Sequence, residues 1–236
     1  MKSHYRVLAD IKEKYDIDIV SGADRHELNV GYNEAAPTAV RDYVEFFLHK
    51  ELAVYANEVV RKSGVGRIVL CKNIATSGRP CNGIAEMKIL QLPFWKNTIY
   101  LSVKESRSAY DRATIHHELF HAIDFHDDFW RYTDLEWPKL NAKDFQYGTI
   151  AYTGNSKYKE GGFISVHGTS AVYEDKADLY AHMLVNYSGV AEQAETDPIL
   201  KAKMARMKEL LSKFSPQFDN EFWERRAADS ISVYSN

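Results

Sequence analysis

The five-residue pattern His-Glu-x-x-His, which begins at His117 and ends at His121, constrains this 236-residue chain more than any other feature. In a helix, side chains four residues apart lie one turn above each other, so the two imidazoles can face one point. The pattern lies among apolar residues typical of a buried helix, namely Ile115, Leu119, Ala122 and Ile123. Unpaired imidazoles would be costly there, and a metal ion held by both offsets that cost. The sequence therefore predicts a helix over about 108–125 that carries two metal ligands.

Two neighbours of these histidines have different predicted roles. Glu118 cannot share their face as an equivalent ligand, but its carboxylate can reach a water bound to the metal and act as a general base. His116 lies five residues before His121, which turns it toward another face of the helix. We therefore expect His116 to be a neighbour of the site and not a ligand.

A third ligand is expected further along the chain. The pattern HExxHxxGxxH is excluded, because Asp124 and Asp127 stand where it needs glycine and histidine. A second helix begins with Glu174-Asp175-Lys176-Ala177-Asp178, where Glu174 can complete the ligand set. Asp178 lies one turn later and can accept a hydrogen bond from a ligating histidine.

Two alternatives for this acidic segment stay open. It can be a solvated helix N-terminus, where the helix dipole favours carboxylates. Alternatively, Asp175 or Asp178 is the ligand instead of Glu174. In each metal-binding case the imidazole and carboxylate ligands favour Zn²⁺.

The remaining pattern predicts one α+β domain over 1–236, with a small mixed or antiparallel sheet. Its first part, about 1–126, would contain the N-terminal helices, the sheet and the His-Glu-x-x-His helix; its second part, about 127–236, would contain a loop region, the glutamate helix and a helical tail. Helices are predicted over 2–15, about 38–63, 173–186, 197–214 and 218–227, and strands over 17–20, 67–72, 84–90 and 98–103.

Composition excludes some classes of protein. A net charge of −3, with 30 basic residues scattered among 33 acidic ones, gives no basic surface for nucleic acid. No run approaches the roughly 18 apolar residues of a membrane span, and no signal peptide is visible at the start of the chain; the compartment is left undecided. Cys71 and Cys81 can form a disulfide or remain free thiols.

Several segments of the chain resemble a known peptidase family. His117–Asp124, Phe163–Gly168 and Glu174–Ala181 are similar to the gluzincin peptidases related to the anthrax lethal factor catalytic domain and the Pro-Pro endopeptidases. They are closer still to a group of bacterial zinc-binding metallopeptidases, whose further motifs match Trp137–Asn141 and Phe145–Gly148. The resemblance implies a zincin-like fold, Zn²⁺ and a peptide or protein substrate.

One position departs from those relatives. They carry a tyrosine seven residues before the glutamate ligand, where this chain has His167. A histidine can donate the same hydrogen bond to an oxyanion, as in the thermolysin-like gluzincins. The alternative is a loop histidine without a catalytic role, with Tyr152 or Tyr173 as possible substitutes.

The sequence thus predicts a zinc-dependent peptidase with His117, His121 and Glu174 as ligands and Glu118 as general base. A substrate would lie extended along an edge of the sheet, at about 84–90. The alternatives are a non-catalytic zinc-binding protein and a metallohydrolase that does not act on peptides. A tyrosine-rich binding protein would leave the His-Glu-x-x-His pattern unexplained.

Overall fold

The structure, a computed structural model, describes residues 2–21, 25–27, 30–87, 97–103, 109–127, 134–149 and 161–233. The chain divides into two compact units, an N-terminal unit over Met1–His126 and a C-terminal unit over Asp127–Asn236. The predicted α+β class, with a small mixed sheet and a mainly helical C-terminal part, is confirmed. A single catalytic domain over the whole chain stays a prediction.

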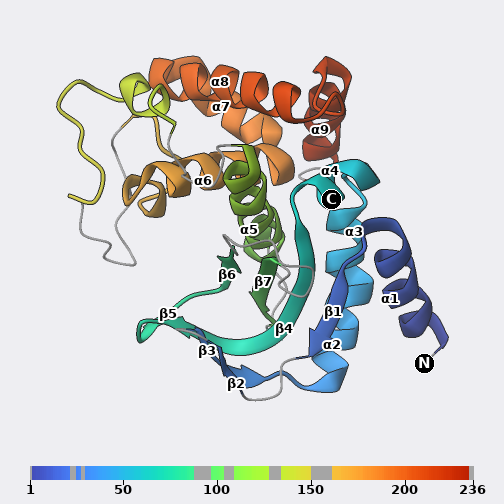
Figure 1. The fold of residues 1–236 in the computed structure, drawn as a ribbon. Helices are drawn as coiled ribbons and strands as arrows, with labels where there is room; N and C mark the ends of the chain where they lie inside the picture. The colour runs from blue at the N-terminus through green and yellow to red at the C-terminus, as the bar shows by residue number, and fades with distance from the viewer. Residues whose placement is uncertain are drawn as a thin grey trace. The chain divides into compact units, whose positions relative to one another are not determined.

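The N-terminal unit begins with a helix and then alternates strands and helices before the helix that carries the histidines (Figure 1). Its elements are α1 (Lys2–Tyr15), β1 (Asp18–Ser21), β2 (Arg25–Glu27), β3 (Val30–Glu34), α2 (Pro37–Tyr43), the π-helical turn η1 (Val44–Leu48), α3 (His49–Leu52), α4 (Asn57–Lys62), β4 (Val65–Thr76), β5 (Arg79–Pro80), β6 (Gly83–Glu86), β7 (Asn97–Ser102) and α5 (Ala109–Asp127).

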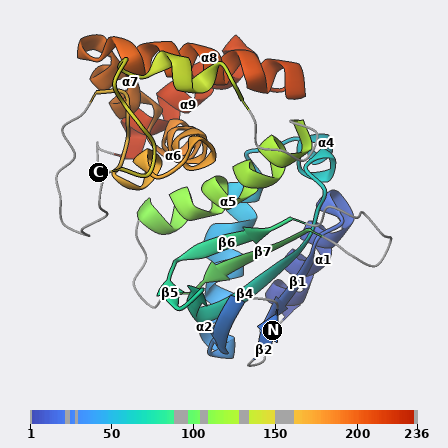
Figure 2. The same cartoon turned by 60° about the vertical axis from the view of Figure 1, so that its left-hand side comes forward.

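The sheet of this unit is mixed and centres on β4 (Figure 2). Its order is β2-β3-β4-β7-β6; β1 pairs with β4 in parallel and β5 pairs with β4 in antiparallel orientation. The β4–β7 pair is parallel, whereas β6 runs antiparallel to β7. Because Ile68, Val69, Leu70 and Cys71 are all buried, β4 is covered on both faces, as expected for a central strand. In this order β6 is the last strand.

The helix predicted over about 38–63 is interrupted in the structure. It forms α2, η1 and α3 without a break, then leaves helical geometry after Leu52 and resumes as α4 at Asn57. At the interruption, the hydroxyl of Tyr15 donates to the carbonyl of Leu52 at 3.0 Å, so a group from α1 satisfies part of the helix end. Local periodicity could not predict this partner. The strands β2, β3 and β5, which are short, were not predicted either.

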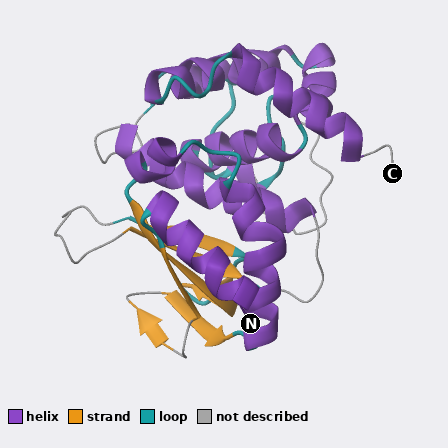
Figure 3. Cartoon of the chain, turned by 90° about the vertical axis from the view of Figure 1, so that its right-hand side faces the viewer, coloured by secondary structure: helices purple, strands orange, loops and turns teal. Residues whose placement is uncertain are grey.

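The C-terminal unit contains helices and loops in its described residues (Figure 3). Its elements are the 3₁₀ turns η2 (Trp137–Leu140) and η3 (His167–Thr169) and the helices α6 (Val172–Val185), α7 (Tyr187–Thr196), α8 (Pro198–Phe214) and α9 (Asn220–Val233). Helix α7 was not predicted; it begins where the Asn186 side chain accepts a hydrogen bond from the amide of Gly189. None of the described helices is long and apolar enough to cross a membrane.

A buried polar cluster joins α5 to the segment that contains α3. His116 is fully buried, and its Nε2 lies 2.9 Å from Glu51 Oε2 while its Nδ1 lies 2.6 Å from the Tyr55 hydroxyl. Arg112 donates to the other Glu51 oxygen at 2.6 Å. Burial alone would raise the pKa of Glu51, but hydrogen bonds and charge attraction from His116 and Arg112 outweigh it and lower the pKa to about 2. The cluster therefore holds α5 by its buried side.

We predict that this cluster makes stability acid-sensitive. The pKa of Glu51 is about 2 in the folded chain, against 4.5 for an unperturbed glutamate, so its contribution to the free energy of unfolding is present above pH 4.5 and is lost as the pH falls toward 2. The contribution is about 3 kcal/mol at neutral pH. The test is urea unfolding at pH 7, 4.5 and 3. The free energy of unfolding should fall less with decreasing pH in Glu51→Gln than in wild type, and as much as in wild type in the exposed control Glu58→Gln. Parallel losses in wild type and Glu51→Gln would contradict the prediction.

Candidate metal centre

Helix α5 brings the two predicted histidine ligands together. The Nε2 atoms of His117 and His121 lie 3.1 Å apart, with ring centroids 4.7 Å apart and ring planes at 88°. A tetrahedral ion with Zn–N distances of 2.0–2.1 Å separates two ligand nitrogens by about 3.3 Å. The spacing of the imidazoles therefore fits the two nitrogen positions of a zinc site with little adjustment.

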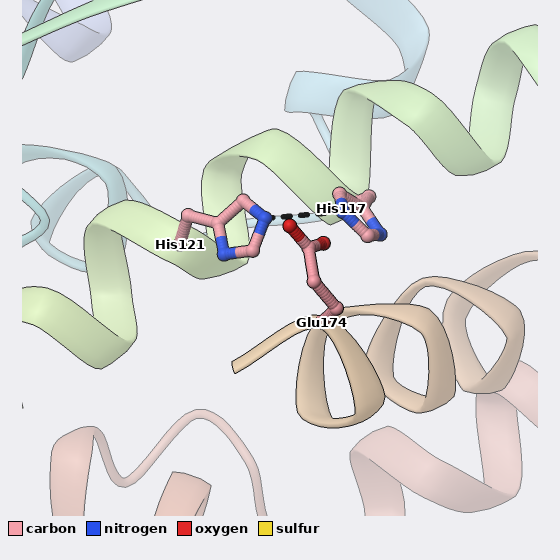
Figure 4. Close-up of side chains that lie close together, drawn as sticks. All are labelled: His117, His121 and Glu174. Atoms are coloured by element: carbon pink, nitrogen blue, oxygen red, sulfur yellow. Dashed lines mark hydrogen bonds between the residues drawn. The ribbon is translucent and has the colours of Figure 1, made fainter. Parts of the chain in front are cut away.

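Glu174, in the first turn of α6, offers a third ligand atom. The three side chains that the sequence predicts as ligands, His117, His121 and Glu174, are labelled in Figure 4. Two imidazoles and a carboxylate are the donor set of a catalytic zinc site, in which three protein ligands leave a fourth position for water. The chemistry of these side chains thus fits Zn²⁺.

Glu118, the predicted general base, is buried against strand β6. It is 5% exposed. Gly83 of β6 comes so close that a Cβ atom there would lie 2.7 Å from Glu118 Oε1 and 2.8 Å from Thr114 Cγ2. Real Cβ atoms essentially never come within 3.0 Å of such neighbours. The absence of a side chain at Gly83 therefore lets the strand and the Glu118 carboxylate lie in contact, a role that the sequence analysis missed.

The two cysteines lie in the same part of the N-terminal unit, and both are free. Burial raises the pKa of Cys71 to about 12. Burial and the nearby negative charge of Glu118 raise the pKa of Cys81 to about 11. Both thiols are therefore protonated at neutral pH in the metal-free protein.

The segment that contains His167 contacts two residues of α6, Glu174 and Asp178, in ways that the sequence did not specify. His167 Nε2 lies 2.9 Å from Glu174 Oε2, and half of the His167 side chain is exposed. Asp178 accepts a hydrogen bond from the Ser165 hydroxyl, whose oxygen accepts from the amides of His167 and Gly168. The segment 165–168 is thereby held onto α6. The predicted roles of His167 at an oxyanion and of Asp178 as an orienting group stay predictions, and Tyr152 lies outside the described residues.

Asp175, the alternative ligand, is engaged elsewhere. Its side chain is 2% exposed, and its Oδ2 accepts hydrogen bonds from Trp137, Tyr147 and Lys203. These three donors favour Glu174 over Asp175 as the ligand. The sequence contained a signal that Lys203 is buried, because this lysine falls among the apolar positions of α8: Leu200, Met204, Met207 and Leu211.

Comparison with known proteins gives the family of this chain. A family model described as "Putative zinc-binding metallo-peptidase" matches residues 76–216, which is more than half of the chain. The chain belongs to this family. The metallopeptidase match includes His117, Glu118, His121 and Glu174, the four residues that the sequence analysis placed at the centre.

Comparison with solved structures supports the fold of this chain. The chain is similar to the solved structure of a protein from Bacteroides caccae described as a putative zinc-binding metallo-peptidase. The TM-score is 0.60, and the identity is 17% over 97% of this chain and 92% of the other. At this identity the likeness shows the fold alone. No curated protein matches the chain.

We predict that the space at Gly83 is a structural requirement. In Gly83→Ala, the added methyl group meets Glu118 and Thr114, so we expect the free energy of unfolding to fall by about 1–3 kcal/mol, the usual cost of overpacking. The substitution Thr114→Ser removes the side-chain methyl group that the new alanine would meet. Chemical denaturation of the two single variants and the double variant should show a smaller cost in the Thr114→Ser background; an equal cost in both would contradict the predicted close approach.

Proposed function

We propose that this zinc-binding metallopeptidase is a gluzincin that hydrolyses peptide bonds, with Zn²⁺ held by His117, His121 and Glu174. The observation that carries the proposal is that the Nε2 atoms of His117 and His121 lie 3.1 Å apart while Glu118 follows His117 on the same helix. The family description supports zinc and peptidase chemistry in general. The ligand set, the gluzincin type and a single catalytic domain over 1–236 are the specific parts of the proposal.

In the proposed reaction Glu118 moves the proton. When bound, zinc would act as a Lewis acid that lowers the pKa of a coordinated water and polarises the peptide carbonyl. Glu118 would accept a proton from the attacking water as the water adds to the carbonyl carbon, and would then donate that proton to the leaving nitrogen as the C–N bond breaks. Burial of Glu118 against Gly83 supports this role, because a carboxylate with little freedom to move is already placed for proton transfer.

The proposal keeps two further residues at the centre. His167 is the proposed donor to the oxyanion; its contact with Glu174 and its half-exposed ring support a place beside a substrate. Asp178 is the proposed orienting group of the ligand set. Its hydrogen bond with Ser165 supports an indirect form of that role, since Ser165 holds the amide of His167.

The proposed substrate is a peptide or protein segment in extended form. Strand β6 is the last strand in the sheet order, and its first residue, Gly83, contacts Glu118. A chain that added to this edge would gain backbone hydrogen bonds next to the general base. Within the predicted edge 84–90, residues 88–90 lie outside the described part of the chain.

Two other functions share the ligand set and are separated by experiment. A non-catalytic zinc-binding protein would have no need for Glu118 beside the histidines. A metallohydrolase that does not act on peptides would use the same residues on another bond. Cleavage of peptides, and its dependence on Glu118, decides between these alternatives and the proposal.

The central test is cleavage of a peptide library by wild type and Glu118→Gln, each with and without a chelator. We expect the wild type to cleave only with metal, and Glu118→Gln to lose 10²–10⁴-fold in rate, the usual contribution of general acid–base catalysis. Glu118→Gln should keep one zinc ion per chain by metal analysis, because Glu118 is not a ligand. Cleavage that persists in this variant or in chelator would refute the mechanism, and zinc binding without cleavage would favour the non-catalytic alternative.

A second test addresses the third ligand. Glu174→Gln removes a charged oxygen ligand, so zinc affinity, measured by competition with a chelating dye, should fall by more than the roughly 10–100-fold that loss of an outer partner costs. Glu192→Gln, the same change at an exposed position of α7, serves as the control and should keep wild-type affinity. Equal affinities in the two variants would remove Glu174 from the ligand set.

A further inference from the structure

A buried lysine and aspartate form the centre of a polar cluster in the C-terminal unit. Lys203 of α8 is fully buried, and its Nζ donates to Asp175 Oδ2 at 2.7 Å and to the carbonyl of Gly162 at 2.7 Å. The same Asp175 oxygen accepts from Trp137 Nε1 at 2.8 Å and from the Tyr147 hydroxyl at 2.6 Å. Three donors from two distant segments of the chain thus meet on one carboxylate oxygen.

The cluster holds the start of helix α6 through Asp175. Helix α6 begins after Ala171, which has no side chain able to cap the helix, and no side-chain cap is formed. Asp175 lies in the first turn, and its amide makes the first helical hydrogen bond, to the carbonyl of Ala171 at 3.0 Å. The donors to Asp175 therefore hold a helix end that would otherwise fray. Glu174 is the preceding residue on that turn.

The cluster also gives a physical role to two motifs that the proposed mechanism does not use. Trp137, from the first motif, donates to Asp175, and Asn141 from the same motif donates to the Tyr147 hydroxyl at 2.9 Å. Tyr147, from the second motif, donates its own hydroxyl proton to Asp175. Both motifs thus hold Asp175 in place.

The loop that carries His167 is tied to the same lysine. Lys203 Nζ lies 3.6 Å from the centre of the Phe163 ring, and it holds the carbonyl of Gly162. These contacts fix the chain a few residues before Ser165, the residue that holds the amide of His167. Lys203 therefore reaches both the glutamate helix and this loop.

Burial makes the cluster dependent on all of its members. Loss of water raises the pKa of Asp175 and lowers the pKa of Lys203, because each charge is disfavoured in the interior. The hydrogen bonds from Tyr147 and Trp137 oppose this effect on Asp175. A buried carboxylate that loses one donor keeps the cost of desolvation and has less to offset it, so it is expected to move.

We propose that Asp175, Lys203 and Tyr147 are positioning residues that place Glu174 for metal binding by fixing the first turn of α6. The inference rests on the proposed function, in which Glu174 is the third ligand. It assigns to the Asp175 cluster a role in metal affinity, beyond the stability that any buried network provides. A merely structural cluster would lower the melting temperature and leave the zinc affinity of the folded protein unchanged.

The test uses conservative variants of the full chain. Tyr147→Phe removes one donor to Asp175, and Lys203→Met removes the charged donor while keeping an unbranched side chain of similar length. In chelating-dye competition, carried out at a temperature where each variant is folded, we expect zinc affinity to fall about tenfold or more in each. In the metal-free protein, hydrogen exchange of the amides of 175–178 should be faster than in wild type.

The chain offers matched controls in the same unit. The Tyr187 hydroxyl accepts a hydrogen bond from Lys208 Nζ at 2.5 Å, and Lys208 lies on α8 like Lys203. Tyr187→Phe and Lys208→Met therefore make the same chemical changes in a tyrosine–lysine pair away from Asp175. Both should keep wild-type zinc affinity and wild-type exchange of the amides of 175–178.

Each outcome decides the proposal. Weaker zinc binding and faster exchange in Tyr147→Phe, with neither change in the controls, supports it even if Lys203→Met does not fold. Wild-type affinity in folded Tyr147→Phe and Lys203→Met, with weak binding in Glu174→Gln, overturns this inference alone. Wild-type affinity in Glu174→Gln overturns the third ligand of the proposed function, and the inference fails with it.

Discussion

The separation of 3.1 Å between the two Nε2 atoms of His117 and His121 is the constraint on which the rest of the centre depends. Two imidazole nitrogens at this distance can bind one metal ion together, because a tetrahedral zinc site needs nearly the same separation. To keep both rings facing the proposed metal ion, helix α5 must be fixed in both rotation and position. A small rotation of α5 would turn both rings away together, because residues four apart share one face.

Helix α5 is fixed by contacts on its other sides. His116, one residue before the first proposed ligand, is buried between Glu51 and Tyr55. Glu118 and Thr114 of the same helix lie close against the bare backbone of Gly83 in β6. Residues next to His117 and His121 thus hold helix α5, and with it the two proposed ligands, in one orientation.

Helix α6 in the C-terminal unit is also held by the residue next to a proposed ligand. Asp175 is the neighbour of Glu174, as His116 is the neighbour of His117, and each neighbour points into its own unit and is held by several polar partners. Adjacent residues in a helix point about 100° apart, so one can be buried and fixed while the other faces a ligand. The family match over 76–216 contains both pairs, together with the motif residues Trp137 and Tyr147 that hold Asp175.

The amino-acid sequence by itself determined the local part of this arrangement. The α+β class, most of the long helices and the convergence of His117 and His121 follow from periodicity, because spacing along a helix is a local property. Three features were decided only in the tertiary structure: which acidic residue near the start of α6 is held by buried donors, what holds His116, and which group bonds to the helix end at Leu52. Each depends on a partner more than 25 residues away in the chain, and no local pattern specifies which distant donor will satisfy a buried group.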